Sequence, residues 1–367
     1  MAYTTARGLT DSIQGHLSLE LTTRCNCDCR HCFARAGLSE EATLDPALVE
    51  TICEEGFHIG YRRLHLTGGE PLLWPDLWDL LEKVFTLGYH SVFLNTNGLL
   101  LDRATASRLA RYKGLSLSVS LEESREWHDA LRGPGTYRCA AEGIACAVAA
   151  GVPLRIFTVI GKTLLTRLSA FVDAVAQKFP GIEGLTLIEI TGDPAALGDL
   201  SRELMAPDDF VRMVRTISVL NLCGFITAVL NDPLVNVAAD LMQLPYVPPS
   251  GALCRPGKLV IRADRRMTLA HSTRESFGTY SPGALAKVLT GRDYRKAVGP
   301  DNVTCPTCRY RLLCRKHGMW QPSIRIVDRE LGLPFCQRVL GCIDTSVERH
   351  HYDKCPVPHP VGRRRKP

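Results

Sequence analysis

The feature that most constrains this chain is a short loop with three cysteines near its N-terminus. Cys25, Cys29 and Cys32 follow a strand-like run, Leu17–Leu21, at C-x3-C-x2-C spacing. Iron–sulfur clusters are usually held by four cysteine thiolates, so three ligands leave one iron of a cubane without a protein ligand. A metal with an open position is suited to chemistry. The loop therefore predicts a reactive cluster, with a zinc knuckle as the alternative and Cys27 as a bystander.

Composition limits the classes of protein to which the chain can belong. Its 367 residues suffice for one large domain and a smaller one, and 45% hydrophobic content is ordinary for a globular protein. No apolar stretch approaches the length of a membrane span. Fifteen cysteines without a signal peptide favour metal ligation in a reducing cytoplasm over disulfides. The net charge of +6 sits partly in the basic tail, without an aromatic-interleaved patch, so we expect no nucleic-acid role.

The first two thirds of the chain read as strands alternating with helices, which is the pattern of parallel βα units. Six such units predict a partial (β/α)6 barrel, since eight would need more chain before residue 250. The predicted strands are Leu17–Leu21, Arg63–Thr67, Ser91–Thr96, Leu115–Leu121, Leu154–Ile160 and Gly184–Ile190.

Several of these strands alternate between apolar and polar residues instead of being apolar throughout. Ser18 and Glu20 alternate with leucines in the first strand, and Ser118 and Ser120 do so in the fourth. Period-two alternation places the polar set on one face of a strand. Crossover helices cover the outer face, so we expect a polar lumen that holds a ligand.

A second motif follows the second strand, where Gly68-Gly69-Glu70 precedes Pro71. Together with the cysteine loop, it resembles the signature of the radical S-adenosylmethionine (radical SAM) enzymes. The resemblance implies that Cys25, Cys29 and Cys32 hold a [4Fe-4S] cluster whose open iron binds SAM. It also implies that Glu70 accepts hydrogen bonds from the SAM amine.

The resemblance implies further SAM contacts at the carboxyl ends of the strands, where parallel α/β folds bind their ligands. Phe33 matches the family's aromatic residue near the adenine, and Arg132 matches an arginine that pairs with the SAM carboxylate. The predicted SAM-binding set is Phe33, Gly68, Gly69, Glu70, Asn95, Asn97, Ser118, Ser120 and Arg132. No catalytic residue is identified, but Glu20 and Glu189 are candidates.

Past residue 245 the chain becomes rich in cysteine. Cys305, Cys308 and Cys314, at C-x2-C-x5-C spacing, resemble the SPASM extension of radical SAM enzymes, which binds auxiliary iron–sulfur clusters. Cys336 fits as the fourth ligand of one auxiliary [4Fe-4S] cluster. The stretch from residue 254 to 271 resembles the hairpin that precedes this motif. A zinc site of four cysteines is the alternative.

Two positions depart from the SPASM pattern. The family usually has cysteines where this chain has His271 and Gly318. A second auxiliary cluster is therefore either lost or rebuilt from Cys254, Cys342, Cys355 and a histidine, and histidine ligation would raise its potential.

The predicted domains are an N-terminal extension (1–16), a radical SAM partial barrel (17–244), a SPASM-like domain (245–355) and a basic tail (356–367). The implied chemistry is reductive cleavage of SAM to a 5′-deoxyadenosyl radical that takes hydrogen from a substrate.

The first hypothesis for the substrate is a ribosomal peptide that the enzyme crosslinks, oxidises or epimerises. A flavodoxin or ferredoxin would donate electrons. A separate protein would bind the leader peptide, because only about 16 residues precede the first strand. The alternatives are an epimerase or dehydrogenase of a sugar or antibiotic precursor, and a non-catalytic iron–sulfur electron-transfer protein.

Overall fold

The structure is a computed structural model, and it describes residues 15–32, 42–191, 197–250, 256–271, 276–298, 305, 307–319 and 333–352. Its described strands form one sheet in the order β7-β6-β5-β4-β3-β2-β1-β8-β9. Every neighbouring pair is parallel except β8 and β9. The predicted parallel α/β architecture is therefore confirmed.

The strands are β1 (Leu17–Glu20), β2 (Arg63–Thr67), β3 (Ser91–Thr96), β4 (Leu115–Ser120), β5 (Leu154–Ile160), β6 (Gly184–Glu189), β7 (Thr227–Val229), β8 (Leu259–Ile261) and β9 (Met267–Thr268). The six predicted strands agree with β1–β6 to within one residue at each end. The parallel part of the sheet is longer than predicted, because β7 and β8 also join it. Each has only three residues, too few for a periodic signal.

The helices of the barrel are α1 (Pro46–His58), α2 (Leu77–Leu87), α3 (Arg103–Leu109), α4 (Arg125–Arg132), α5 (Thr136–Ala149), α6 (Lys162–Lys178), α8 (Pro207–Leu222) and α9 (Leu234–Leu241). The later helices are α10 (Ala284–Thr290), α11 (Arg292–Val298), α12 (Arg311–Lys316) and α14 (Phe335–Tyr352), and the 3₁₀ turns are η1 (Pro71–Leu73) and η2 (Gly198–Glu203).

Helix ends follow capping rules that the sequence makes visible. Asp45 caps α1 by accepting a hydrogen bond from the Leu48 N–H, with Pro46 at the first helical position. Helix α2 ends at Gly88, whose φ of 102° favours glycine. Helix α4 was not predicted, although its cap Ser124 accepts a hydrogen bond from the Trp127 N–H. This helix carries Arg132 toward the cysteine loop.

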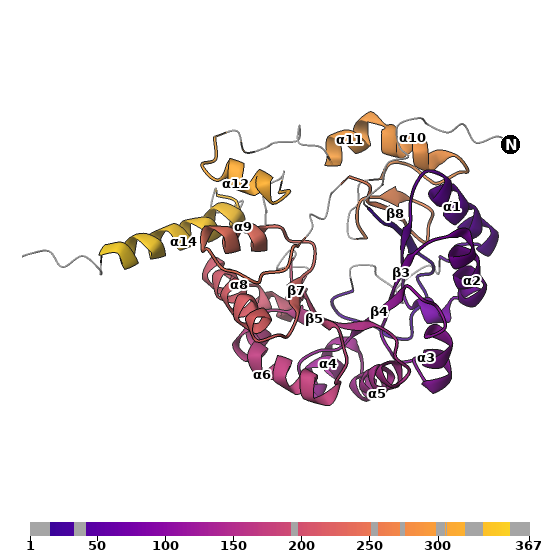
Figure 1. The fold of residues 1–367 in the computed structure, drawn as a ribbon, viewed down its shortest axis with the longest axis horizontal. Coiled ribbons are helices and arrows are strands. Elements are labelled where there is room, and N and C mark those ends of the chain that lie inside the picture. The colour runs from indigo at the N-terminus through magenta and orange to yellow at the C-terminus, as the bar shows by residue number, and fades with distance from the viewer. Residues whose placement is uncertain are drawn as a thin grey trace, which may run out of the picture.

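The curved sheet lies inside a ring of helices, with α1, α2, α3, α5, α6 and α8 around its outside (Figure 1). Leucines of the strands, such as Leu19, Leu66 and Leu117, are fully buried against these helices. The polar residues that alternate with them therefore belong to the opposite, inner face.

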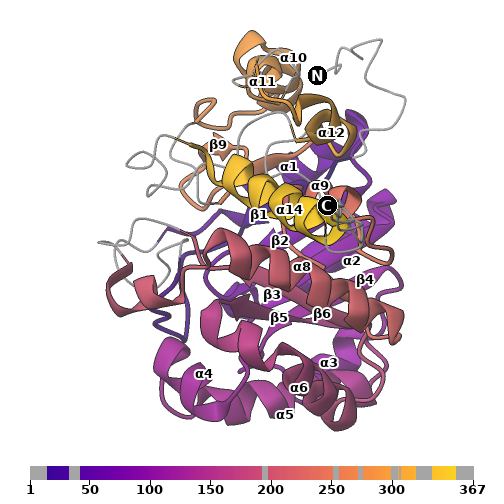
Figure 2. The ribbon, with the colours of Figure 1, turned by 90° about the vertical axis from the view of Figure 1, so that its left-hand side faces the viewer.

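The C-terminal part of the chain is built onto the same sheet and the same core. Strand β8 pairs in parallel with β1, Leu17 lying opposite Leu259. Helix α14 packs on α8 and α9 and lies alongside α8 in Figure 2. Its Phe335 ring meets Phe210 of α8 edge to face, with centroids 5.7 Å apart. The predicted domain boundaries stay predictions, but the sheet continues across the one at residue 245.

No helix among the described residues is both long enough and apolar enough to cross a membrane.

We predict that Phe335→Ala destabilises the whole protein, because this side chain is 2% exposed in the joint core of α14 and α8. Removing a buried phenylalanine side chain costs about 3–5 kcal/mol in the free energy of unfolding. Urea unfolding of the protein measures the change. The matched control is Leu222→Ala at the exposed end of α8 (61% exposed), which we expect to change stability by less than about 0.5 kcal/mol. Equal effects of the two substitutions would contradict the packing of α14 on α8.

Candidate active site

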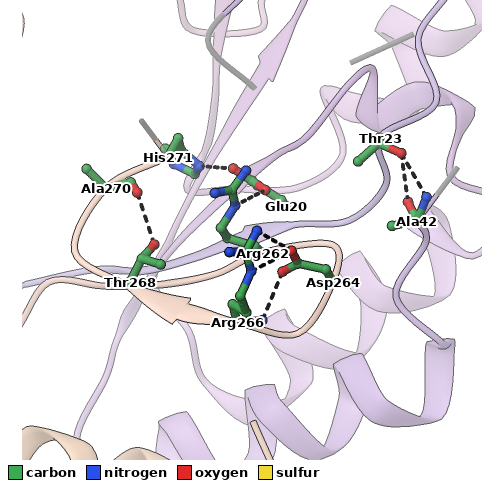
Figure 3. Close-up of polar contacts among 9 residues, drawn as sticks. All are labelled: Glu20, Thr23, Ala42, Arg262, Asp264, Arg266, Thr268, Ala270 and His271. Atoms are coloured by element: carbon green, nitrogen blue, oxygen red, sulfur yellow. Dashed lines mark hydrogen bonds and ion pairs between the residues drawn. The ribbon is translucent and has the colours of Figure 1, made fainter. Parts of the chain in front are cut away.

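The two ends of the loop that follows β1 are held together at its base. The Thr23 N–H donates to the Ala42 carbonyl at 2.8 Å. The Ala42 N–H donates to the Thr23 hydroxyl at 2.9 Å (Figure 3). The Thr22 and Thr43 hydroxyls lie 2.8 Å apart. This double connection fixes the segment from which the three cysteines extend. Phe33, predicted to contact SAM, lies outside the described residues.

The Gly68-Gly69-Glu70 segment fixes the same loop from the side of β2. The Gly69 N–H donates to the Thr22 carbonyl at 2.6 Å, and the Glu70 N–H donates to the Arg24 carbonyl at 2.8 Å. A Cβ on Gly69 would lie 2.1 Å from the Arg24 oxygen. A Cβ on Gly68 would lie 2.4 Å from the Thr22 oxygen, and its φ of +147° is itself unusual for other residues. These glycines thus admit the backbone of the cysteine loop.

The Glu70 carboxylate is fully buried between the ends of β2 and β3. It accepts hydrogen bonds from the Thr96 hydroxyl at 2.8 Å, the Asn97 N–H at 2.7 Å and the Leu72 N–H at 3.1 Å. Burial raises the pKa of Glu70 to about 7, although these donors favour the charged form. Its predicted contact with the SAM amine stays a prediction.

The Asn97 side chain, just past β3, reaches the cysteine loop. Its amide nitrogen donates to Asn26 Oδ1 at 2.7 Å and lies 3.8 Å from Cys25 Sγ. The hydrogen bond places Asn97 beside the first predicted cluster ligand.

Arg132 approaches the loop from the end of α4. Its Nε and Nη2 donate to Glu122 Oε1 at 2.9 and 2.7 Å, and its Nη1 lies 3.9 Å from Cys29 Sγ. Glu122 also accepts from the Thr158 hydroxyl and the Val159 N–H of β5. Burial by itself would raise the pKa of Glu122, but the charges of Arg132 and His31 and the hydrogen bonds from Val159 and Arg132 together outweigh it and hold the pKa below its usual range. In the structure Arg132 therefore contacts Glu122 and Cys29, and its pairing with SAM stays a prediction.

The cysteine loop has the chemistry that an iron–sulfur cluster requires. A hydrogen bond with the Cys27 thiol is the main cause that lowers the pKa of Cys25 to about 6, and it also lowers the pKa of Cys29. Arg132 lowers the pKa of Cys29 further. Thiolates are the ligand form, and donors such as Asn97 and Arg132 near the sulfurs tune cluster potentials. These residues fit a cluster on Cys25, Cys29 and Cys32.

No three His, Cys, Asp or Glu side chains in the described part of the chain gather as they would around a single metal ion. The ligands of a cubane cluster need not converge on a single point, because each of them binds a separate iron.

The predicted polar lumen has its residues on adjacent strands. Asn95 of β3 lies opposite Ser118 of β4 in register. Ser118 is 2% exposed, and its hydroxyl has no hydrogen-bond partner among the described residues. Ser120 follows two positions later on the same face. These three residues thus share one region of the inner face, next to Asn97.

The two catalytic candidates lie on different strands, with four strands between β1 and β6. Glu20 ends β1, and its carboxylate accepts from His271 Nδ1 at 2.7 Å and from Arg262 Nε at 3.4 Å (Figure 3). Glu189 ends β6, opposite Ile160 of β5. Of the two candidates, Glu20 has the more completely defined surroundings.

The C-terminal cysteines come from α12, the turn before it and the start of α14. Burial, and then the nearby thiolates of Cys336, Cys308 and Cys305, raise the pKa of Cys314 to about 12. The other three predicted ligands of the auxiliary cluster thus lie near enough to Cys314 for their charges to act on it, and the cluster itself stays a prediction. Tyr310, next to this group, hydrogen-bonds to Asp344 of α14.

The proposed second auxiliary set is not brought together among the described residues. Cys254 and Cys355 lie outside them. Cys342 hydrogen-bonds to Asp208 at the start of α8. His317 precedes Gly318, the second position that departs from the SPASM pattern. Its Nε2 lies 2.8 Å from Oδ2 of Asp240 in α9.

The sequence did not predict the contacts that Glu122, Arg262 and His271 make in the site. Glu122 continues the polar alternation of β4, which predicts its place on the inner face but does not pair it with Arg132. The contact of Glu20 with Arg262 and His271 spans more than 240 positions of sequence, and no local signal predicts it.

We predict that Gly69→Ala impairs iron binding by the cysteine loop, because the new methyl group would force the Arg24 carbonyl away. Iron and acid-labile sulfide after anaerobic reconstitution should fall by about four atoms per chain, the content of one cubane. Gly341→Ala in α14 is the control, because a Cβ there meets nothing within 4 Å. An unchanged iron content in Gly69→Ala would contradict this role.

Comparison with known proteins agrees with this geometry. The model of the radical SAM superfamily matches residues 19–166. Mycofactocin maturase MftC of Mycobacterium ulcerans (strain Agy99) is 28% identical over 178 residues, which cover 48% of each chain. GTP 3′,8-cyclase of Pelotomaculum thermopropionicum is 34% identical over 151 residues, 40% of this chain and 46% of the relative. The chain thus spans about half the length of the curated relatives it matches.

Two solved structures share the fold. Native anSMEcpe with bound AdoMet has a TM-score of 0.63 and 16% identity, covering 82% of this chain and 88% of its own. Streptococcus suis SuiB bound to precursor peptide SuiA has a TM-score of 0.60 and 16% identity, covering 76% of this chain and 65% of its own. The cysteine loop, the strand order and the matched residues lead to one conclusion: residues 19–166 are a radical SAM domain, and the cysteine-rich region after it fits an auxiliary domain.

Proposed function

We propose that this chain is a radical SAM enzyme that modifies a peptide substrate held in the lumen of its partial barrel. The observation that most supports it is the fixed cysteine loop, with Asn97 beside Cys25 and Arg132 beside Cys29. When bound, a [4Fe-4S] cluster with SAM supplies a 5′-deoxyadenosyl radical that takes a hydrogen atom from the substrate.

The chain's own residues would bind, orient and shield the reactants. Cys25, Cys29 and Cys32 hold the cluster, and Gly68 to Glu70 keep their loop in place. Ser118, with an unpartnered hydroxyl on the inner face, offers a hydrogen bond to SAM or substrate. The aromatic side chains of Phe93 and Phe157, with ring centroids 5.9 Å apart, form an apolar part of the same lumen. Such a mixed surface suits a side chain presented by an extended peptide.

A peptide is the favoured substrate because relatives of this fold act on peptides. MftC is named as a maturase, and SuiB was crystallised with its precursor peptide. In the proposal, a ferredoxin or flavodoxin donates electrons, and a separate protein presents the leader peptide. Cys305, Cys308, Cys314 and Cys336 would hold an auxiliary cluster that accepts an electron or binds the substrate.

The match to GTP 3′,8-cyclases favours a small molecule as the second candidate substrate. Incubating the reconstituted enzyme with SAM, dithionite and a synthetic copy of any short peptide found to be encoded beside its gene separates the two. A mass change in the peptide supports the first proposal. An unchanged peptide, together with consumption of a sugar or nucleotide substrate, supports the second.

We predict that replacing Cys25, Cys29 and Cys32 together with alanine abolishes formation of 5′-deoxyadenosine from SAM. Without the thiolates no cluster is bound, and SAM receives no electron. Liquid chromatography of the quenched reaction measures the product. Cys223→Ala, at an exposed cysteine after α8, is the control and should retain the wild-type rate. Turnover at the wild-type rate by the triple variant would refute the proposed function.

Replacing Cys305, Cys308 and Cys314 with alanine should preserve SAM cleavage but stop modification of the peptide. Iron should fall from about eight to about four atoms per chain if each cubane holds four. Elemental analysis and mass spectrometry of the peptide test both parts. Continued peptide modification would restrict these cysteines to a structural role. Zinc found in the wild-type protein would show that they form a zinc site instead of an auxiliary cluster.

A further inference from the structure

His271, where the SPASM pattern has a cysteine, is held beside the end of β1. Its Nδ1 lies 2.7 Å from Glu20 Oε1, and the two side chains are 17% and 4% exposed. An ionised carboxylate only accepts hydrogen bonds. The Nδ1 atom therefore carries the proton in the neutral imidazole, and Nε2 is left as an acceptor.

The Nε2 atom of His271 is buried and has no hydrogen-bond partner among the described residues. A buried acceptor without a partner is unfavourable, and a donor from a bound molecule would relieve it. A ligand that placed a donor next to Nε2 would complete the hydrogen bonding of the His271 ring.

The surroundings of His271 place it on the inner face of the barrel. Its ring lies edge-on to His65 of β2, with centroids 5.6 Å apart. The ring centroid of His65 lies 5.5 Å from that of Phe93 on β3, and the centroid of Phe93 lies 5.9 Å from that of Phe157 on β5. His271 is therefore at one end of a row of rings that crosses the inner face of the strands.

The loop that carries His271 has a defined path. The Thr268 hydroxyl at the end of β9 donates to the Ala270 carbonyl at 3.0 Å (Figure 3). Arg262, which follows β8, donates to the second oxygen of Glu20. Because β8 pairs with β1, the hairpin places both Arg262 and His271 at Glu20. Glu20 is thus held by a cation on one oxygen and an imidazole on the other.

We propose that His271 accepts a proton from the substrate through Nε2 and that Glu20 is its positioning residue. The proposal rests on the function proposed above. In this step an O–H or N–H bond of the substrate breaks, its electron pair stays on the substrate, and an N–H bond forms at Nε2. The resulting imidazolium is stabilised by the Glu20 carboxylate. No electron is transferred, so the step needs no oxidant.

The charged and titratable groups that face this pair come from three directions. Arg262 lies after β8, His65 lies on β2, and His16 lies just before β1 against His65. From the β8 side, Arg266 also interacts with the Glu20 charge, and Lys258 acts on His65. Burial lowers the pKa of His65 well below its usual range, so this neighbour is neutral. The only opposite charge that the structure places in contact with the His271 ring, within the described residues, is Glu20.

The first test needs neither a cluster nor a substrate. Long-range ¹H–¹⁵N correlation spectra of ¹⁵N-histidine-labelled protein identify the tautomer, with His271→Asn assigning the signal. We expect a protonated Nδ1 and an unprotonated Nε2. A neutral ring with its proton on Nε2 would overturn the proposal.

The second test uses reconstituted enzyme, SAM, dithionite and the synthetic peptide described above. His271→Asn should lower peptide modification by about 100-fold or more, the usual contribution of a general base, while 5′-deoxyadenosine is still formed. Glu20→Gln should move the acidic limb of the pH–rate profile by about one unit or more, toward lower pH, because the imidazolium loses its counterion. His58→Asn, at the exposed end of α1, is the matched control and should behave as wild type.

Three results separate the possible failures. No 5′-deoxyadenosine from the wild type refutes the proposed function and, with it, this step. Undiminished peptide modification by His271→Asn refutes only the role of His271. Loss of about four irons from His271→Asn, the content of one cubane, would make His271 a cluster ligand instead of a base.

Discussion

Two backbone hydrogen bonds set the geometry on which the rest of this site depends. They join Gly69 and Glu70, after β2, to the carbonyls of Thr22 and Arg24, after β1. Because the strands are parallel, both connections form at the same edge of the sheet. The cysteine loop is consequently part of the sheet edge, where the side chains of Asn97, just past β3, and Arg132, at the end of α4, reach it. Only glycine permits this approach, because a Cβ on Gly68 or Gly69 would lie within 2.4 Å of a carbonyl oxygen of the loop.

The sequence predicted the barrel well because its strands carry two strong signals. Strand–helix alternation indicated the parallel sheet, and the alternation of Ser118 and Ser120 with apolar residues indicated the inner face. Strand β7 was not predicted because three residues give no period, and the predicted hairpin that contains β8 was not expected to pair with β1. Helix α4 was not predicted because Arg125–Arg132 is short and mostly polar. Contacts such as Arg132 with Glu122 could not be predicted, since they depend on how a helix and a strand pack in space.

The C-terminal region makes two separate contributions to the site. One is the set of cysteines whose charges act on Cys314, which comes from α12, the turn before it and the start of α14. The other is the hairpin of β8 and β9, which supplies Arg262 and His271 to a carboxylate of β1. Histidine suits position 271, where the SPASM pattern has a cysteine, because its imidazole hydrogen-bonds to the Glu20 carboxylate. A cysteine thiolate at this position would be repelled by the same carboxylate.

The pairing of β8 with β1 also has a consequence for how the chain can be divided. A chain cut after residue 244 would leave β1 with unpaired N–H and C=O groups on the side that Leu259 to Ile261 now cover. It would also uncover the face of α8 around Phe210, where α14 packs. An uncovered strand edge and bare apolar surface are each prone to self-association. We therefore expect a chain that ends at residue 244 to aggregate, because the later segment covers both surfaces.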